Sequence, residues 1–407
     1  MNRKTFLFLL ALFLPLCLFA QYFNTPPLLV PFIETAPEVI STSAVLIDAA
    51  SGALLYSKAP DQEISPASLT KLMTLHLLMK EIDSGRASYD EIIPITVESW
   101  AQSQPPRSSL MFLAPGQIVT LREIMIGLAV PSGNDAAVAA ALRLAPSMDD
   151  FAALMTAEAR LMGLAVTRFT ESSGISEDNM TTAAEFAYFC RQYIKLHPHS
   201  LKDFHSVPVF AYPVADNVPE IFRANPHTII QYNRNSLLRT FPGVDGLKTG
   251  YIDEAGYNIA LTAEREDTRF IAVILGAPAE PGGIRIRDAD GTRLLTWAFE
   301  NFKTVRPVID HIENARLYKG RANTVELKLA DTPDFTSPLD RADKLFFETV
   351  IPVPLAAPLP EGAAAGYLSI SDEHGELSRA PLVTARYCEK GNIFKRIWHS
   401  IVLLFKR

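Results

Sequence analysis

The 407-residue chain is too long for one ordinary domain, so two or three folding units are expected. Hydrophobic residues make up 48% of the chain, which supports packed cores and excludes an intrinsically disordered protein. A net charge of −7 argues against a nucleic-acid-binding protein, and no nucleic-acid partner is expected.

The first twenty residues have the composition of an export signal. A short basic start, Met1–Lys4, precedes the almost wholly apolar run Phe6–Ala20. This run is shorter than the roughly 20 apolar residues that a membrane-spanning helix needs. We therefore expect a signal peptide over residues 1–20 and a Pro-rich leader over 21–37 of an exported protein. An uncleaved N-terminal anchor is the alternative.

The middle of the chain predicts a hairpin, then helices, then strands and a last helix. Two β-rich runs around a turn at Gly52 indicate a hairpin over residues 43–57. Ser65 as N-cap and Pro66 at the first helical position predict a helix that continues to Met79. The other expected elements are helices over 134–144, 149–162, 181–193 and 287–302, and strands over 247–251, 257–264 and 269–276. This order predicts a layered α/β domain over residues 38–303.

After Thr304 the pattern changes to short strand-like runs punctuated by prolines. The runs cover residues 316–318, 324–329, 344–350 and 366–370. They predict a small β-rich domain over residues 304–387.

The last segment, residues 388–407, is predicted to be an amphipathic helix at a membrane surface. It carries five Lys or Arg against one Glu, and its apolar residues recur at helical spacing. Those apolar residues are Ile393, Phe394, Ile397, Trp398, Ile401, Val402 and Phe405. A terminal helix packed on the protein's own domain, or a dimerisation helix, is the alternative.

Three short motifs carry side chains suited to nucleophilic catalysis. Ser68-Leu-Thr-Lys71 puts a hydroxyl and an amine on one helical face, and the amine can act as a base once it has lost its charge. Burial or a second cation, for which Lys248 is a candidate, would lower the pKa of Lys71. Ser132-Gly-Asn134 and Lys248-Thr-Gly250 follow in that order. Each motif alone could have a purely structural role, as a helix start, a turn or an edge strand. The three motifs together, in this order, favour an enzyme.

The motifs resemble those of the low-molecular-mass penicillin-binding proteins, and more narrowly the serine D-alanyl-D-alanine carboxypeptidases. The segments that carry the likeness are Ile64–Thr74, Pro131–Ala137, Tyr232–Leu238 and Val244–Tyr251. The resemblance covers almost the whole chain. It implies an α/β (α+β) fold: a penicillin-binding-protein/β-lactamase-like catalytic domain with an antiparallel sheet flanked by helices, plus a small C-terminal β-rich domain. No cofactor and no metal are expected.

The resemblance also implies a role for each matching residue. Ser68 would form the acyl-enzyme, Lys71 would be its base, and Ser132 would pass a proton to the leaving D-alanine. Asn134 would bind the peptide carbonyl of the substrate. The residues expected around the substrate's terminal carboxylate are Arg234, Lys248, Thr249 and Gly250, with Arg287 as a further candidate that could instead be a solvated residue at a helix start. The N–H groups of Ser68 and Tyr251 would form the oxyanion hole.

The function implied is removal of the terminal D-alanine from peptidoglycan pentapeptide stems, on the periplasmic side of the cytoplasmic membrane. The implied partners are the stem peptide, β-lactam antibiotics and, through the C-terminal helix, the membrane surface. A D,D-endopeptidase and a non-catalytic wall-binding homologue are the alternatives. A class A β-lactamase is disfavoured because no Glu-x-x-Leu-Asn stands between the second and third motifs. Two departures, Ile252 in place of Thr and a partly matching loop at 171–179, leave the deacylation rate and the substrate preference open.

Overall fold

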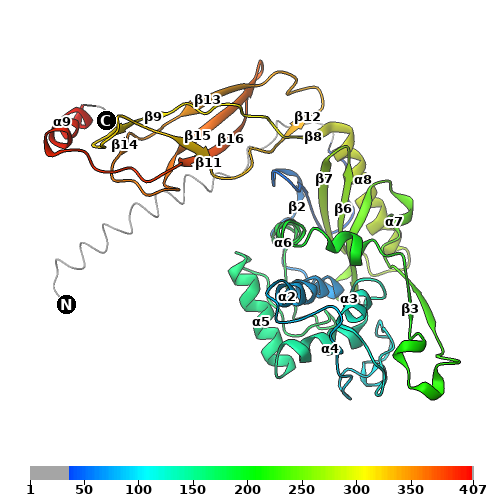
Figure 1. Ribbon diagram of the computed structural model, residues 1–407. Coiled ribbons are helices and arrows are strands. Elements are labelled where there is room, and N and C mark those ends of the chain that lie inside the picture. The colour runs from blue at the N-terminus through cyan, green and yellow to red at the C-terminus, as the bar shows by residue number, and fades with distance from the viewer. Residues whose placement is uncertain (1–35, 406–407) are drawn as a thin grey trace. The chain divides into compact units, whose positions relative to one another are not determined.

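The computed structural model describes residues 36–405, and the chain divides into two compact units, 33–300 and 301 onward (Figure 1). The predicted signal peptide and nearly all of the predicted leader lie outside the described residues, so they remain predictions. Each unit is described by itself below.

A five-stranded antiparallel sheet, in the order β2-β1-β7-β6-β5, organises the first unit. Its strands are β1 (Ser43–Asp48), β2 (Leu54–Lys58), β5 (Val244–Ile252), β6 (Gly256–Arg265) and β7 (Thr268–Ala277). The N-terminal hairpin thus completes a sheet whose other strands lie some 200 residues later. Successive strand residues face opposite sides of the sheet. Val273 and Leu275 join the main core, whereas Ile274 lies beside Gly291, which belongs to the last helix of this unit.

Helices cover both faces of this sheet. They are α2 (Lys71–Asp83), α3 (Leu121–Ala129), α4 (Asn134–Leu144), α5 (Met148–Leu161), α6 (Ala183–Leu196), α7 (Leu237–Thr240) and α8 (Gly283–Asn301), with a hairpin of β3 (Val209–Tyr212) and β4 (Ile229–Tyr232). Local signals explain several starts. Thr182 caps α6 by accepting from the Glu185 N–H, and Thr120 and Glu123 form a reciprocal capping box at α3.

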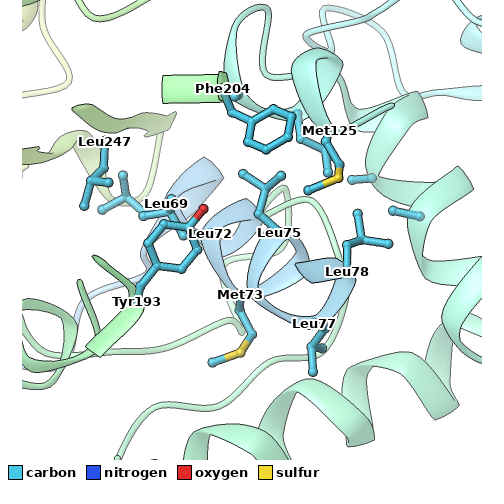
Figure 2. Close-up of a cluster of buried hydrophobic side chains, with 14 of the residues drawn as sticks. Leu69, Leu72, Met73, Leu75, Leu77, Leu78, Met125, Tyr193, Phe204 and Leu247 are labelled. Atoms are coloured by element: carbon cyan, nitrogen blue, oxygen red, sulfur yellow. The ribbon is translucent and has the colours of Figure 1, made fainter. Parts of the chain in front are cut away.

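Helix α2 lies at the centre of the hydrophobic core, and Figure 2 shows apolar side chains on every side of it. Every residue from Lys71 to Met79 is buried. A helix with apolar residues around most of its circumference is found in such a buried position. Each large apolar side chain removed from water contributes about 1.5 to 3 kcal/mol. The core therefore fixes the start of α2, where Lys71 stands.

The structure differs from the sequence-based prediction at the start of this helix. Pro66 does not open an α-helix. Residues Ala67–Thr70 form a 3-10 turn in which Ala67 has a φ of 50°, and α2 begins only at Lys71. Ser68 thus lies in that turn rather than in the first turn of an α-helix. The prediction also missed α3, although Thr120-x-x-Glu123 is a capping-box signal, and it missed the β3–β4 hairpin.

The second unit is built of mostly antiparallel strands around its own core. Its strands are β8 (Phe302–Val305), β9 (Ala315–Tyr318), β10 (Thr324–Val325), β11 (Leu327–Leu329), β12 (Phe335–Pro338), β13 (Phe346–Val350), β14 (Leu355–Ala356), β15 (Ala364–Asp372) and β16 (Gly375–Thr384). Among the described strands, only β14 and β9 pair in parallel. The sequence-based prediction missed β16. This strand contains Pro381 and has polar residues through most of its first half, and it is held by pairing with both β15 and β11.

Helix α9 (Ile393–Leu404) ends the described chain and contacts this unit through polar side chains. His399 Nδ1 accepts from the Lys319 N–H at 2.6 Å, and Lys395 Nζ donates to the Asn323 side chain at 2.9 Å. The apolar side chains of the helix are exposed instead, with Trp398 at 64% and Phe394 at 81%. No helix within the described residues is both long and apolar enough to cross a membrane.

Candidate active site

The structure brings Ser68 and Lys71 into direct contact. Lys71 Nζ donates to Ser68 Oγ at 3.0 Å, to the Asn134 amide oxygen at 2.8 Å and to the Ser173 carbonyl oxygen at 2.5 Å. Lys71 is fully buried, whereas Ser68 is partly exposed. A buried amine thus holds the hydroxyl that solvent and substrate can reach.

The environment of Lys71 favours its neutral form. The pKa of Lys71 is lowered to about 7, mainly by burial and also by the Arg234 cation. The carboxylates Glu171 and Asp135 oppose this change. Lys71 and Lys248 repel one another. The role of Lys248 as the second cation stays a prediction, and Arg234 is a further cation that the sequence-based prediction did not include. A neutral Lys71 can accept the proton of the serine hydroxyl.

The Ser132-Gly133-Asn134 turn is held rigidly at the start of α4. Ser132 has a φ of 66°, and a Cβ on Gly133 would lie 2.8 Å from the Met111 backbone nitrogen. The Asp135 carboxylate fixes the segment 111–113, because it accepts hydrogen bonds from the three successive N–H groups that begin at Met111. Ser132 Oγ is buried and has no hydrogen-bond partner among the described residues, so it is available to a bound substrate.

Strand β5 lies directly against the nucleophile turn. A Cβ on Gly250 would lie 2.8 Å from the Pro66 carbonyl oxygen and 3.0 Å from the Ser68 nitrogen, so only glycine fits there. Thr249 is buried beside it, and Tyr251 is partly exposed with its hydroxyl donating to Asp253. The close approach places the end of β5 beside the backbone of Ser68.

Lys248 of this strand is a second buried amine. Its Nζ donates to the Thr249 carbonyl oxygen at 2.9 Å. Burial lowers the pKa of Lys248 well below its usual range, and repulsion from Lys71, Arg234 and Arg287 adds to this. An arriving carboxylate would favour the charged form of Lys248 again. The site therefore has positive potential in excess, which suits an anionic substrate end.

Arg234 and Arg287 differ in their hydrogen-bond partners. Arg234 donates through Nε to the Pro131 carbonyl oxygen, which ties it to the chain just before Ser132. Arg287 is buried and donates twice to Asp288, at 2.9 and 2.7 Å, and Asp288 also accepts from Ser236. Arg287 is thus already paired with a carboxylate of the chain. Its role in substrate binding stays a prediction.

The sequence-based reading missed the loop 170–179 as part of the site. The Ser173 carbonyl oxygen contacts Lys71, and Glu171 acts on the pKa of that lysine. The sequence offered one sign that this loop matters to the site: residues 171–179 only partly match the corresponding loop of the family. In the described part of the chain, no group of three or more His, Cys, Asp or Glu side chains could hold a metal ion.

Comparisons with known proteins identify the family. The profile of the D-alanyl-D-alanine carboxypeptidase family matches residues 31–279. This range contains every residue of the Ser68–Lys71, Ser132–Asn134 and Lys248–Gly250 motifs. The chain belongs to this family. It is a serine peptidase, and its reaction is hydrolysis of the D-alanyl-D-alanine end of peptidoglycan peptides, with β-lactams as the related class of ligand.

Individual relatives agree with this assignment. The chain is 31% identical to the D-alanyl-D-alanine carboxypeptidase DacC of Escherichia coli over 91% of its own length and 90% of the relative. It is 29% identical to a D-alanyl-D-alanine endopeptidase of Pseudomonas aeruginosa over 72% of its length and 88% of the relative.

The fold agrees as well. Penicillin-binding protein 5 of Haemophilus influenzae matches with a TM-score of 0.78 and 29% identity, over 88% of this chain and 99% of that structure. The predicted family, fold class and carboxypeptidase activity are thereby confirmed.

Proposed function

We propose that Ser68 is the nucleophile of this carboxypeptidase and that neutral Lys71 is its general base. The observation that carries the proposal is the 3.0 Å contact between the two side chains, together with burial that lowers the pKa of Lys71 to about 7. A base with a pKa near the working pH transfers protons most effectively.

The proposed reaction has two halves. Ser68 Oγ attacks the carbonyl carbon of the last peptide bond, and its proton passes to Lys71. Ser132 then relays a proton to the departing D-alanine amine as the carbon–nitrogen bond breaks, which leaves the stem peptide esterified to Ser68. Water hydrolyses this ester and regenerates the hydroxyl. Asn134, bonded to Lys71, would also bind the peptide carbonyl, and the N–H groups of Ser68 and Tyr251 would stabilise the oxyanion.

Recognition of the free C-terminus is assigned to Lys248, Thr249 and Arg234, with Gly250 allowing the strand to approach and Arg287 reinforcing the positive potential. Cations and hydroxyls in a buried site bind a carboxylate through charge-assisted hydrogen bonds. This arrangement favours a substrate whose terminal carboxylate is free, as in a pentapeptide stem.

The nucleophile is tested by Ser68→Ala, which removes the hydroxyl proposed to form the ester. We expect covalent labelling by a fluorescent penicillin to be abolished, as measured by in-gel fluorescence and intact mass. Ser84→Ala, at an exposed serine just after α2, is the matched control and should label like the parent. Persistent labelling of Ser68→Ala would show that another residue is acylated.

Endopeptidase activity on D,D-crosslinks is a second candidate function, supported by the likeness to the Pseudomonas aeruginosa endopeptidase. Both reactions would use the same acylation chemistry. Digestion of a crosslinked muropeptide dimer, compared with a monomeric pentapeptide, separates the two. Release of monomers at a rate similar to that of D-alanine would establish it.

We further propose that the protein is exported and is held at the periplasmic face of the cytoplasmic membrane by α9. The proposal is supported by the unusual way in which the helix docks, since Lys395 and His399 contact the second unit while the apolar residues are exposed. An exposed apolar face with Trp and Phe suits a membrane interface.

A further inference from the structure

The loop 170–179 forms a tightly built wall of the site. Thr74 of α2 donates to the Ser172 carbonyl oxygen at 3.0 Å, and Lys71 Nζ donates to the Ser173 carbonyl oxygen. Gly174 has a φ of 81°, and a Cβ there would lie 1.8 Å from the Ala67 carbonyl oxygen. The loop is therefore packed against the turn that carries the nucleophile, and small movements of the loop would move the partner of Lys71.

Glu171 holds this loop in shape. Its carboxylate accepts from the Ser173 N–H, the Ser173 hydroxyl and the Gly174 N–H, each at 2.6 Å, and from the Asn179 amide at 2.8 Å. The Asn179 side chain in turn accepts from the Thr170 N–H at 2.7 Å. Four donors occupy both oxygens of the carboxylate, so Glu171 is a structural acceptor and not a free base.

All four partners of Glu171 are neutral, so its negative charge is not cancelled within the loop. That charge acts on Lys71 in the direction opposite to burial and to Arg234. An anion that is bonded only to neutral groups interacts strongly with a cation in a buried site. Glu171 thus combines two effects on the same amine, one geometric and one electrostatic.

We propose that Glu171 is a positioning residue for acylation: it fixes the Ser173 carbonyl oxygen against Lys71 Nζ and supplies the negative charge that keeps Lys71 a strong enough base. The inference rests on the proposed function, in which Lys71 removes the proton of Ser68.

The sign of the effect follows from the charges. Because Glu171 raises the pKa of Lys71, replacing it by a neutral residue lowers that pKa below about 7. Lys71 would then be neutral at lower pH, so the acid limb of the acylation rate would move to lower pH. The plateau would fall, because a less basic amine accepts the proton less readily and because the loop is no longer held.

The test is the second-order rate constant for acylation by a fluorescent penicillin, measured from pH 5 to pH 9 in the full chain. For Glu171→Gln we expect the midpoint of the acid limb to fall by roughly half a unit or more. We expect its plateau to fall about tenfold. Glu177→Gln removes the same charge from an exposed position of the same loop and should match the parent. A Glu171→Gln midpoint equal to that of the parent overturns the proposal.

Glu171→Asp separates the two effects, because it keeps the charge but shortens the side chain. We expect its midpoint to stay near that of the parent while its plateau falls. If Glu171→Gln does not fold, as judged by circular dichroism and thermal unfolding, this variant decides the matter, and a plateau like that of the parent overturns the proposal. Ser68→Ala is run in parallel. If it still labels, the proposed nucleophile is wrong, and that failure is distinct from a failure of the Glu171 inference.

Discussion

At the scale of single residues, the site gathers basic side chains whose charged forms are disfavoured by burial and by one another. Lys71 and Lys248 are both buried amines, and the pKa of each is lowered by burial and by Arg234. For Lys71 the consequence is chemical, since the neutral amine is a base. For Lys248 the proposed consequence concerns binding, since an entering carboxylate would favour the charged form again. Burial thus supports two different proposed tasks, proton transfer at Lys71 and carboxylate binding at Lys248.

Lys248→Ala should chiefly weaken recognition of substrates with a free terminal carboxylate. A lost charge-assisted hydrogen bond costs about 1.5 to 3 kcal/mol, so kcat/KM should fall roughly 10- to 150-fold. An analogue with an amidated C-terminus should show a much smaller change. Lys202→Ala, at an exposed lysine, serves as the control. Equal losses on both substrates would contradict the carboxylate-binding role.

At the scale of elements, α2 is the part on which the site depends, and polar contacts reinforce its apolar packing. Glu158 of α5 accepts from His76 Nε2 at 3.0 Å and from Lys80 Nζ at 2.7 Å, so both partners come from α2. The other ring nitrogen of His76 bonds to His197 Nε2 at 3.0 Å. These bonds fix the rotation of α2, and with it the direction of Lys71.

Glu158→Gln should therefore destabilise the first unit. The hydrogen bond from His76, followed by Lys80, lowers the pKa of Glu158 to about 2. A carboxylate with a lowered folded-state pKa stabilises the fold above its unfolded pKa, and this stability is lost as the pH falls toward the folded value. We expect a loss of about 1 to 3 kcal/mol at pH 7, discounted because Lys80 is partly exposed.

The measurement is urea unfolding of the parent and the variant at several pH values. The difference in unfolding free energy should shrink between about pH 5 and pH 2, since the parent carboxylate is then protonated. Glu177→Gln, which changes an exposed glutamate, should show almost no difference. A pH-independent difference would mean that the ionised carboxylate is not the source of the stability.

At the scale of the whole molecule, the chain divides into two compact units that carry different features. Every side chain assigned to the reaction belongs to the unit 33–300, whereas α9 belongs to the other. The second unit has its own hydrophobic core, so it can hold α9 without drawing on the packing around Lys71. Membrane attachment should therefore be separable from catalysis.

The double variant Trp398→Glu/Ile401→Glu tests this separation. Placing two carboxylates on the exposed apolar face should reduce binding to phospholipid vesicles about tenfold or more in a sedimentation assay. Hydrolysis of a soluble pentapeptide should be unchanged. Val308→Glu adds a charge at an even more exposed apolar residue outside the helix and should bind like the parent. Unchanged vesicle binding would point to the N-terminal segment as the anchor.

The sequence by itself determined the chemistry and the order of the parts. The motifs at Ser68, Ser132 and Lys248 can be read from residue types and spacing, and α4 spans the predicted residues 134–144 because its Ala-rich sequence is a local signal. The helical spacing of the apolar residues in α9 likewise predicted that helix from the sequence.

Tertiary structure alone decided what surrounds Lys71. Arg234 is a further cation that lowers its pKa, and the Ser173 carbonyl oxygen and Glu171 come from a loop 100 residues further on. The 3-10 turn at Ser68 likewise depends on packing against Gly174 and Gly250. The burial of Lys71 and the charges near it depend on which distant segments contact one another in the folded chain. Local sequence patterns do not predict those contacts.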